Sequence, residues 1–240
     1  MQFDISQNWW QFLMIAIVCY FVGCFNFAFF ISKMQKKDIT QMGSGNPGTM
    51  NMTREFGIKI GFITFFGDAF KGGIPAVITY CIYKGFVFTG TQTLVSDFVR
   101  YFCGLFVVLG HIFPVTMRFK GGKGIASTLG LFWMCLACEN IWWLLVCFLC
   151  LLGVIAFIYF TEWGSLGSLL GVTGFSIIQA VIFVSRYSQA MLNAYLVCLY
   201  MLIIAINILT WCAHSKNLYR LFSGEEHRTS FKKLVKNKKK

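Results

Sequence analysis

The sequence predicts an all-α integral membrane protein, and two observations carry this prediction. The 240-residue chain is 57% hydrophobic and only 12% charged, whereas soluble domains carry about 25% charged residues. Its apolar residues also form long continuous runs instead of alternating with polar residues at a helical or strand period, so lipid is the expected solvent. The ten cysteines fall in or against these runs, which is typical of small core residues in a reduced compartment.

Seven apolar runs predict about seven transmembrane helices, some of them short or broken. The first run opens on the aromatic pair Trp9-Trp10, a usual anchor at the membrane interface. The second is interrupted at 67–75 by glycines and a proline, and the fourth is so short that it is either a tilted helix or a broken one. The predicted spans are 9–31, 58–83, 98–117, 125–138, 141–160, 165–184 and 191–212.

Seven spans put the two termini on opposite sides of the membrane, and the basic residues orient them. Of the 21 Lys and Arg residues, 17 fall in the loops of one side and in the C-terminal segment, whereas Lys84, Arg100 and Arg186 fall on the other side. Basic loops stay in the cytoplasm, so we expect the N-terminus outside and the C-terminus in the cytoplasm. Residues 1–213 then form a single polytopic membrane domain, and residues 214–240 form a cytoplasmic C-terminal motif and basic tail.

This topology places four stretches rich in glycine or polar residues on the cytoplasmic face, namely 43–54, 118–124, 161–165 and 214–226. In the second of them, Gly121, Gly122 and Gly124 surround Lys123, with Arg118 and Lys120 just before. Glycines let the backbone turn tightly, so that its N–H groups can face a bound ligand. A basic turn at the start of a helix suits an anionic ligand such as phosphate. The alternative interpretation is a basic loop that only fixes the topology.

The first polar stretch supplies neutral hydrogen-bonding groups beside one cation. Ser44, Asn46 and Asn51 precede Arg54 and could form a polar cradle for phosphate and hydroxyl groups. The same residues also suit an ordinary turn, because Asn, Gly and Pro are the usual turn formers.

Asp68, Lys71 and His111 are ionisable residues well inside the predicted spans. Asp68 and Lys71 are three residues apart and can pair on one helix. Their retention favours a function or packing specificity, because an unpaired charge at mid-bilayer costs about 2.5–3.5 kcal/mol. His111 is a lone histidine in an apolar helix, where a hydrogen-bonded core residue is commoner than a catalyst.

The C-terminal motif repeats polar residues at helical spacing. His214, Asn217 and Arg220 line one side of a helical turn, and Glu226 follows Gly224. Alone, this pattern also fits a membrane-surface helix that contacts lipid phosphates.

Several catalytic classes are excluded by missing motifs. The sequence has no serine-hydrolase elbow, Walker A loop or HExxH motif. Neither His111 nor His214 is followed five residues later by an aspartate, so the His-x-x-x-x-Asp dyad of common glycerolipid acyltransferases is absent. Cys135 and Cys138 have no second pair to complete a zinc set, and we expect no metal. Nucleic-acid binding is disfavoured because no soluble domain could carry it.

Taken together, the four stretches and the second span resemble the bacterial integral-membrane acyl-phosphate:glycerol-3-phosphate acyltransferases (PlsY). The matching motifs follow one another in order from residue 43 to residue 226. They are Gly43-Ser44-Gly45-Asn46-Pro47-Gly48 with Asn51 and Arg54, Gly67-Asp68 with Lys71-Gly72 and Pro75, Gly110-His111-Ile112-Phe113-Pro114, Phe119-Lys120-Gly121-Gly122-Lys123-Gly124, and His214, Asn217, Arg220-Leu221, Gly224 and Glu226.

The sequence also departs from the family pattern. Where the family usually has Thr-Arg-aromatic-x-Ser, this chain has Glu162 in place of the arginine, so Ser165 is carried over and Glu162 is not. Ser215 stands where arginine is frequent, and Thr49-Met50 stands where the first motif usually has Ala-Thr.

The resemblance implies transfer of a fatty acyl group from long-chain acyl phosphate to the 1-hydroxyl of sn-glycerol 3-phosphate. The products are 1-acylglycerol 3-phosphate (lysophosphatidic acid) and phosphate, in phospholipid biosynthesis without a cofactor. It further implies a multi-pass protein of the bacterial plasma membrane with its active site facing the cytoplasm. Membrane lipids and the soluble enzyme that makes acyl phosphate are expected partners.

The resemblance also implies roles for residues that match the motifs. Deprotonation would come from His214 or from a substrate phosphate. The expected catalytic residues are Ser44, Asn46, Lys123, Ser165 and His214, the expected phosphate-binding residues are Arg54, Gly121, Gly122, Lys123, Gly124, Asn217 and Arg220, and the expected supporting residues are Asn51, Asp68, Lys71, His111 and Glu226. The competing interpretation is a membrane transporter or channel for a small phosphorylated anion, which would use the same basic mouth and broken helices.

Overall fold

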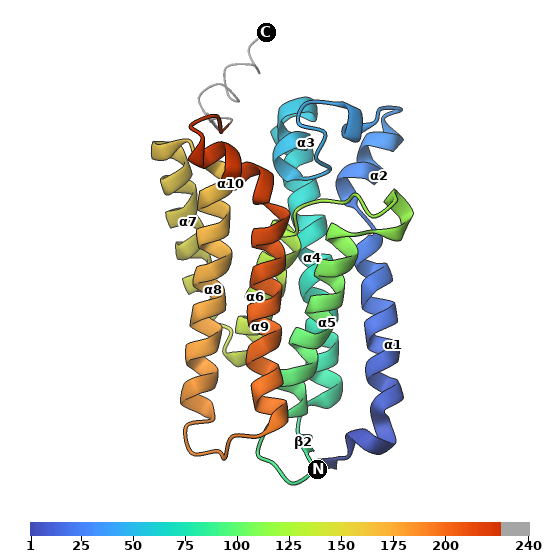
Figure 1. The fold of residues 1–240 in the computed structure, drawn as a ribbon, viewed down its shortest axis with the longest axis vertical. Helices are drawn as coiled ribbons and strands as arrows, with labels where there is room; N and C mark the ends of the chain where they lie inside the picture. Colours follow the sequence, from blue (N-terminus) through green and yellow to red (C-terminus); the bar gives the residue numbers. More distant parts are fainter. Residues whose placement is uncertain (227–240) are drawn as a thin grey trace.

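The computed structural model describes residues 1–226, so the basic tail predicted for 227–240 lies outside the described residues. Helices dominate, as the sequence predicts, and most of them stand side by side along one axis (Figure 1). The elements are β1 (Gln2–Phe3), α1 (Ile5–Cys24), α2 (Phe27–Met34), a 3₁₀ turn (Ile39–Gln41), α3 (Thr49–Phe56), α4 (Ile58–Tyr83), β2 (Val87–Phe88), α5 (Val95–Ile112), a second 3₁₀ turn (Val115–Met117), α6 (Ile125–Glu139), α7 (Trp143–Thr161), α8 (Gly164–Arg186), α9 (Ala194–Ala213) and α10 (Ser215–Phe222).

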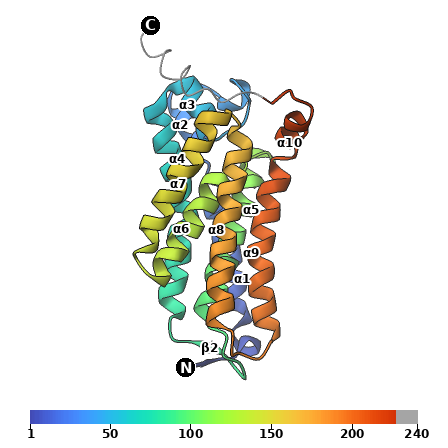
Figure 2. The same cartoon turned by 90° about the vertical axis from the view of Figure 1, so that its left-hand side faces the viewer.

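Among the described residues, five helices are long and apolar enough to cross a membrane: α1, α5, α7, α8 and α9. The other two predicted spans correspond to α4, which carries the Asp68–Lys71 pair, and to α6, which has 15 residues. In both views α6 ends within the height of the bundle, and α7 starts there (Figures 1 and 2). β1 and α10 lie at opposite ends of the bundle (Figure 1). The side of the membrane that each end faces stays a prediction.

The prediction of one continuous helix over 9–31 is wrong. α1 ends at Cys24 and α2 begins at Phe27, with Phe25 and Asn26 in extended conformation between them. The Asn26 side chain accepts a hydrogen bond from the N–H of Phe29 at 2.8 Å. Asparagine is among the best N-cap residues, so it starts a new helix inside an apolar run.

The prediction of an interruption at 67–75 is also wrong, because α4 continues through all of it. The glycines serve close packing against α6. A Cβ atom on Gly72 would lie 2.0 Å from the carbonyl oxygen of Ser127. Downstream of Pro75, the Thr79 hydroxyl donates to the Pro75 carbonyl at 3.0 Å. Side-chain donors of this kind let a transmembrane helix tolerate proline.

α5 is the centre of the core. It packs against α1, α4 and α9, and 14 of its 18 residues are buried. Its contact with α1 depends on small residues, since a Cβ atom on Gly110 would lie 2.1 Å from the carbonyl oxygen of Tyr20. Small-residue contacts of this kind let helix backbones approach closely in membranes.

A second stabilising feature is an ion network toward the end of the bundle opposite α10. Arg100 on α5 is fully buried and pairs with Asp97 at 2.8 Å and with Glu139 at the end of α6. Arg186, at the end of α8, pairs with the same two carboxylates. Two cations and two anions therefore neutralise one another where α5, α6 and α8 meet, which satisfies the requirement that buried charges be paired. We call this cluster the outer ion network.

The close contact between α4 and α6 yields a testable prediction. A Cβ atom on Gly130 would lie 1.9 Å from the carbonyl oxygen of Ala69, so Gly130→Ala should destabilise the protein by about 1–3 kcal/mol through overpacking. The control is Gly174→Ala on α8, where no atom lies within 4 Å of the added Cβ. That variant should be neutral or slightly stabilised, because alanine favours helix over glycine. Thermal unfolding in detergent compares them, and equal melting temperatures would contradict the packing account.

Candidate active site

A cleft of about 1340 Å³ lies at the end of the bundle that carries α3 and α10. Most of its lining comes from the four stretches that the sequence analysis placed on one face: the 43–54 stretch, the glycine-rich turn, the start of α8, and α10 with the residues just after it. Among the described residues that line it, six are basic and three acidic. The cleft is therefore suited to an anionic guest.

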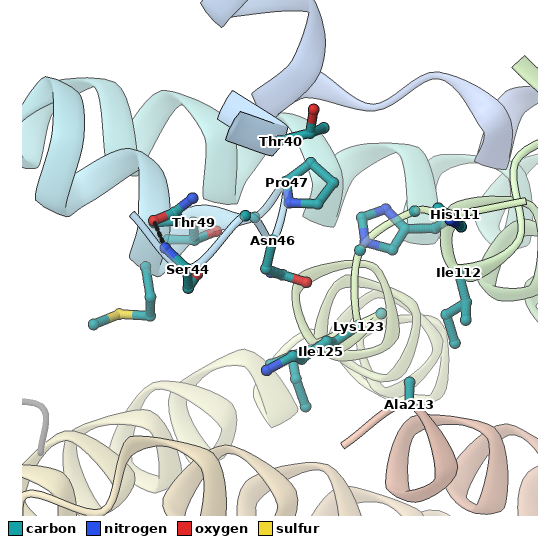
Figure 3. Close-up of a pocket in the computed structure, with 18 of the residues that line it drawn as sticks. Thr40, Ser44, Asn46, Pro47, Thr49, His111, Ile112, Lys123, Ile125 and Ala213 are labelled. Atoms are coloured by element: carbon teal, nitrogen blue, oxygen red, sulfur yellow. Dashed lines mark hydrogen bonds between the residues drawn. The ribbon is translucent and has the colours of Figure 1, made fainter. Parts of the chain in front are cut away.

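The first loop is shaped by two glycines and held by one asparagine. Gly43 and Gly45 have φ values of +53° and +69°, a conformation that glycine adopts without strain. Asn51 is buried, and its Oδ1 accepts a hydrogen bond from the N–H of Ser44 at 3.1 Å, while its Nδ2 donates to the Met42 carbonyl at 2.9 Å. These bonds hold the first loop in place. They leave Ser44 and Asn46 on the cleft wall, across from Lys123 (Figure 3).

The glycine-rich turn departs from the prediction in one respect. The N–H groups of Gly121 and Gly122 donate to the carbonyls of Ile112 and His111 at 3.0 and 3.1 Å, so they do not face a guest. Both positions need glycine, because a Cβ on Gly121 would lie 2.1 Å from the His111 carbonyl oxygen and a Cβ on Gly122 would lie 2.3 Å from His111 Nε2. Their expected role as phosphate-binding N–H donors is wrong.

The backbone N–H groups that are free to bind a ligand belong to the next two residues of the turn. Among the described residues, no hydrogen-bond acceptor contacts the N–H of Lys123 or Gly124. Gly124 has a φ of +84° and forms the N-cap of α6, whose first-turn N–H groups have no partners within the helix. A helix N-terminus of this kind favours a phosphate or carboxylate.

Lys123 belongs to a polar network that joins three segments. Its Nζ donates to Asn217 Oδ1. Asn217 Nδ2 donates to Ser165 Oγ at 2.8 Å and to Glu226 Oε1 at 2.9 Å, and the Ser165 hydroxyl donates to the same carboxylate oxygen at 2.6 Å. Arg220 pairs with the other oxygen of Glu226 at 3.3 Å. The network brings together five residues that the sequence analysis had singled out.

The electrostatics of this network follow from its partial burial. The pKa of Lys123 is lowered to about 8, mainly by burial; the charge of Glu226 opposes this shift, and the charges of Arg220 and Arg54 contribute to it. Burial would raise the pKa of Glu226, but hydrogen bonds from Asn217 and Ser165 and the charge of Arg220 outweigh it and bring the pKa below its ordinary value. Near neutral pH, Lys123 is thus a cation and Glu226 an anion.

His214 lies behind the cleft wall rather than on it. It is buried, and its Nδ1 is 2.7 Å from the carbonyl oxygen of Thr210, which fixes the tautomer with the proton on Nδ1. The pKa of His214 is lowered to about 4, mainly by burial; the Thr210 contact opposes this shift, and the charge of the nearby Lys123 contributes to it. The ring is therefore neutral at physiological pH and a weak base.

Three of the expected supporting residues, Asp68, Lys71 and His111, come from α4 and α5. Asp68 and His111 line the cleft, and so does Arg54 of α3, which was expected to bind phosphate. Lys71 is buried beside Asp68 with 2.7 Å between Nζ and Oδ1. No group of three or more His, Cys, Asp or Glu side chains suited to a metal ion occurs within residues 1–226.

Sequence reasoning missed two residues that hold the loops. Asn26 Nδ2 donates to the Pro47 carbonyl of the first loop at 3.1 Å, and the Thr116 hydroxyl donates to the Cys24 carbonyl at 3.3 Å. A single amide side chain inside the apolar run 21–31 was an available signal for Asn26, because such a residue needs a partner in lipid. Thr116 gave no comparable signal, since a threonine in a helical run can bond its own backbone.

Comparisons with known proteins identify the family of the chain. The family model described as glycerol-3-phosphate acyltransferase matches residues 13–224. The glycerol-3-phosphate acyltransferase of Pseudothermotoga lettingae is 32% identical over 229 residues, which cover 95% of this chain and 99% of the relative. The one from Finegoldia magna is 36% identical over 221 residues, with 92% and 97% covered.

Solved structures agree as well. The crystal structure of PlsY, an integral membrane glycerol 3-phosphate acyltransferase, in its glycerol 3-phosphate form is 30% identical, with a TM-score of 0.72 over 94% of this chain and 98% of that one. Its lysophosphatidic acid form gives a TM-score of 0.73 at 29% identity. Since both the family model and the full-length relatives cover nearly the whole chain, the protein belongs to the glycerol-3-phosphate acyltransferase (PlsY) family of integral membrane proteins.

Proposed function

We propose that the protein transfers a fatty acyl group from acyl phosphate to the 1-hydroxyl of sn-glycerol 3-phosphate, giving lysophosphatidic acid and phosphate. The observation that carries the proposal is the cationic cleft in which Lys123 contacts the Ser165–Asn217–Glu226 network beside the start of α6. The reaction has two anionic substrates. The excess of basic over acidic residues in the lining supports their binding together.

The phosphate of glycerol 3-phosphate has one well-matched position. The N-terminus of α6 offers the N–H groups of Lys123, Gly124 and the first helical turn, and the Lys123 side chain extends into the same cleft (Figure 3). Arg54 and Arg220 line the cleft from two other segments. A hydrogen bond to a charged group contributes about 1.5–3 kcal/mol net, so a few of these groups suffice to bind and orient the substrate.

The chemical step needs orientation more than a strong base. Acyl phosphate is a mixed anhydride, so attack by the hydroxyl oxygen on the acyl carbon and cleavage of its bond to the phosphate oxygen give an ester and phosphate. Ser44, Asn46 and Ser165 are neutral donors on the cleft wall that could orient the hydroxyl and the developing oxyanion. The pKa of His214, about 4, lies below the value of about 6 for the second ionisation of a phosphate ester. This order favours a substrate phosphate over His214 as the acceptor of the hydroxyl proton.

The proposal includes a location. The basic residues at the cleft end of the bundle support a cytoplasmic cleft in the bacterial plasma membrane. Glycerol 3-phosphate would enter from the cytoplasm. Acyl phosphate would arrive with its chain in the membrane, supplied by the soluble enzyme that makes it.

Donor specificity tests the proposed function. Purified protein in detergent is given labelled glycerol 3-phosphate with acyl phosphate, acyl-CoA or acyl carrier protein as donor. We expect lysophosphatidic acid with acyl phosphate only, with one phosphate released per ester formed. Turnover in detergent excludes a transporter, because no compartment is present. Product from acyl-CoA but not from acyl phosphate would contradict the proposal.

Lys123 gives a second prediction, with a pH dependence. The charged form binds the phosphate, and the lowered pKa of about 8 means that this form is present below pH 8 and is lost above it. The KM for glycerol 3-phosphate should therefore rise from about pH 8 upward, whereas Lys123→Arg should shift the rise to higher pH because arginine stays protonated. Lys123→Ala should lower kcat/KM at least about 100-fold, the loss of roughly 2.7 kcal/mol of transition-state binding.

The matched control is Lys59→Ala, which removes an exposed lysine near the start of α4 that is not among the lining residues. Its kcat/KM should stay within about twofold of the unmodified protein. Near-normal turnover of folded Lys123→Ala would refute the role of Lys123.

A further inference from the structure

At the base of the cleft, three ionisable side chains from α4 and α5 are buried together. Asp68, Lys71 and His111 are 1%, 8% and 3% exposed. Lys71 Nζ lies 2.7 Å from Asp68 Oδ1, and His111 Nδ1 lies 3.7 Å from the same oxygen. We call these three residues the buried triad. Buried charges are costly unless they are paired and hydrogen-bonded, so the contacts of these three side chains indicate which parts of the protein they stabilise.

One arm of the triad ends at the break between α1 and α2. Lys71 Nζ donates to the carbonyls of Gly23 at 3.2 Å and of Phe25 at 2.5 Å. The carbonyl of Cys24, between them, accepts the hydroxyl of Thr116. Helix ends leave carbonyls without intrahelical partners, and in lipid such groups must be satisfied by protein. Lys71 and Thr116 therefore make this break possible.

The break leads directly into the first loop of the cleft. Asn26 follows Phe25, caps α2 through Oδ1, and donates through Nδ2 to the Pro47 carbonyl at 3.1 Å. Pro47 lies next to Asn46 in the loop on the cleft wall (Figure 3). A shift of Phe25 would therefore also move Asn26, and through its hydrogen bond to Pro47 it would move the first loop.

The other arm ends at the glycine-rich turn. The ring of His111 lies against Gly122, since a Cβ on that glycine would be 2.3 Å from His111 Nε2. The His111 carbonyl accepts the N–H of Gly122 at 3.1 Å. Asp68 faces the opposite ring nitrogen, Nδ1. One edge of the His111 ring therefore contacts the glycine-rich turn, and the other edge faces Asp68.

We propose that the buried triad is a positioning unit that fixes the first loop, 43–48, relative to the glycine-rich turn, 121–124, so that both contact the same glycerol 3-phosphate molecule. Lys71 suits this role because its ammonium group donates hydrogen bonds to two carbonyls and also forms an ion pair with the Asp68 carboxylate. Methionine can fill the volume but cannot make these contacts. The expected effect on the KM for glycerol 3-phosphate rests on the proposed function, whereas the expected effect on the two loops rests on the geometry alone.

The test compares Lys71→Met with Asp68→Asn/Lys71→Met. The single variant leaves Asp68 buried without its cation and should lose stability. The double variant removes that charge and should regain stability but not the contacts at the helix break. We expect a KM for glycerol 3-phosphate at least tenfold higher in both, and faster hydrogen exchange in peptides covering 43–48 and 119–124. Exchange at the opposite ends of α4 and α5 should stay unchanged.

The matched control is Glu139→Gln in the outer ion network, which also removes a buried ion pair. It should lower the melting temperature while leaving the KM within twofold and both loops unchanged in exchange. His111→Ala, which keeps Lys71 and its contacts, should speed exchange in 119–124 but not in 43–48. If neither Lys71 variant folds, this variant decides the proposal.

Two results would overturn the inference. One is a folded double variant with a KM within twofold of the unmodified protein and unchanged exchange in both loops. The other is unchanged exchange of 119–124 in His111→Ala. If the unmodified protein makes no product in the same assay, the proposed function fails, and the exchange measurements alone decide whether the triad fixes the two loops.

Discussion

The structure depends on one constraint: a charge or an unpaired backbone group inside a membrane needs a partner in the protein. Two buried groups of charged residues satisfy it. The outer ion network joins α5, α6 and α8 through Arg100, Arg186 and two carboxylates, and the buried triad joins α4 and α5 to the break after α1. Positive charge is in excess in the cleft, where water and anionic substrates can reach it. The same rule thus accounts for the stability of the bundle and for the charge of its site.

The cleft exists because regular helices stop there. α1 breaks at Phe25, α5 ends at Ile112, and α6 begins only at Ile125. Irregular backbone is tolerated at membrane depth where it is buried in protein or lines a cavity, and the carbonyls of these segments are taken by Lys71, Thr116 and the N–H groups of the turn. The short α6 connects the cleft to the outer ion network, because its first residues follow Lys123 and its last residue, Glu139, belongs to that network.

The sequence predicts much of this arrangement, and the failures have physical causes. Hydropathy identifies the long helices, and counting basic residues assigns to one face the four stretches that line the cleft. The break at Phe25 is not visible, because apolar residues flank it and its stabilising donor, Lys71, is distant in sequence. Gly72 and Pro75 suggest an interruption in α4, yet Gly72 serves contact with Ser127, which only the packed structure reveals. Likewise, the glycine pattern predicts free N–H groups at Gly121 and Gly122, whereas α5 ends close enough to accept them.

The central claim is that the start of α6 and Lys123 bind the phosphate of glycerol 3-phosphate in the cleft. An experimental structure of this protein with glycerol 3-phosphate tests it most directly. The account predicts phosphate oxygens within about 4 Å of Lys123 Nζ, the usual ion-pair distance, and in contact with the N–H groups that follow Gly122. A phosphate bound instead to Arg118 or Lys216, two other basic residues of the cleft, would contradict it if Lys123 still donated to Asn217 and the N–H groups at the start of α6 stayed free.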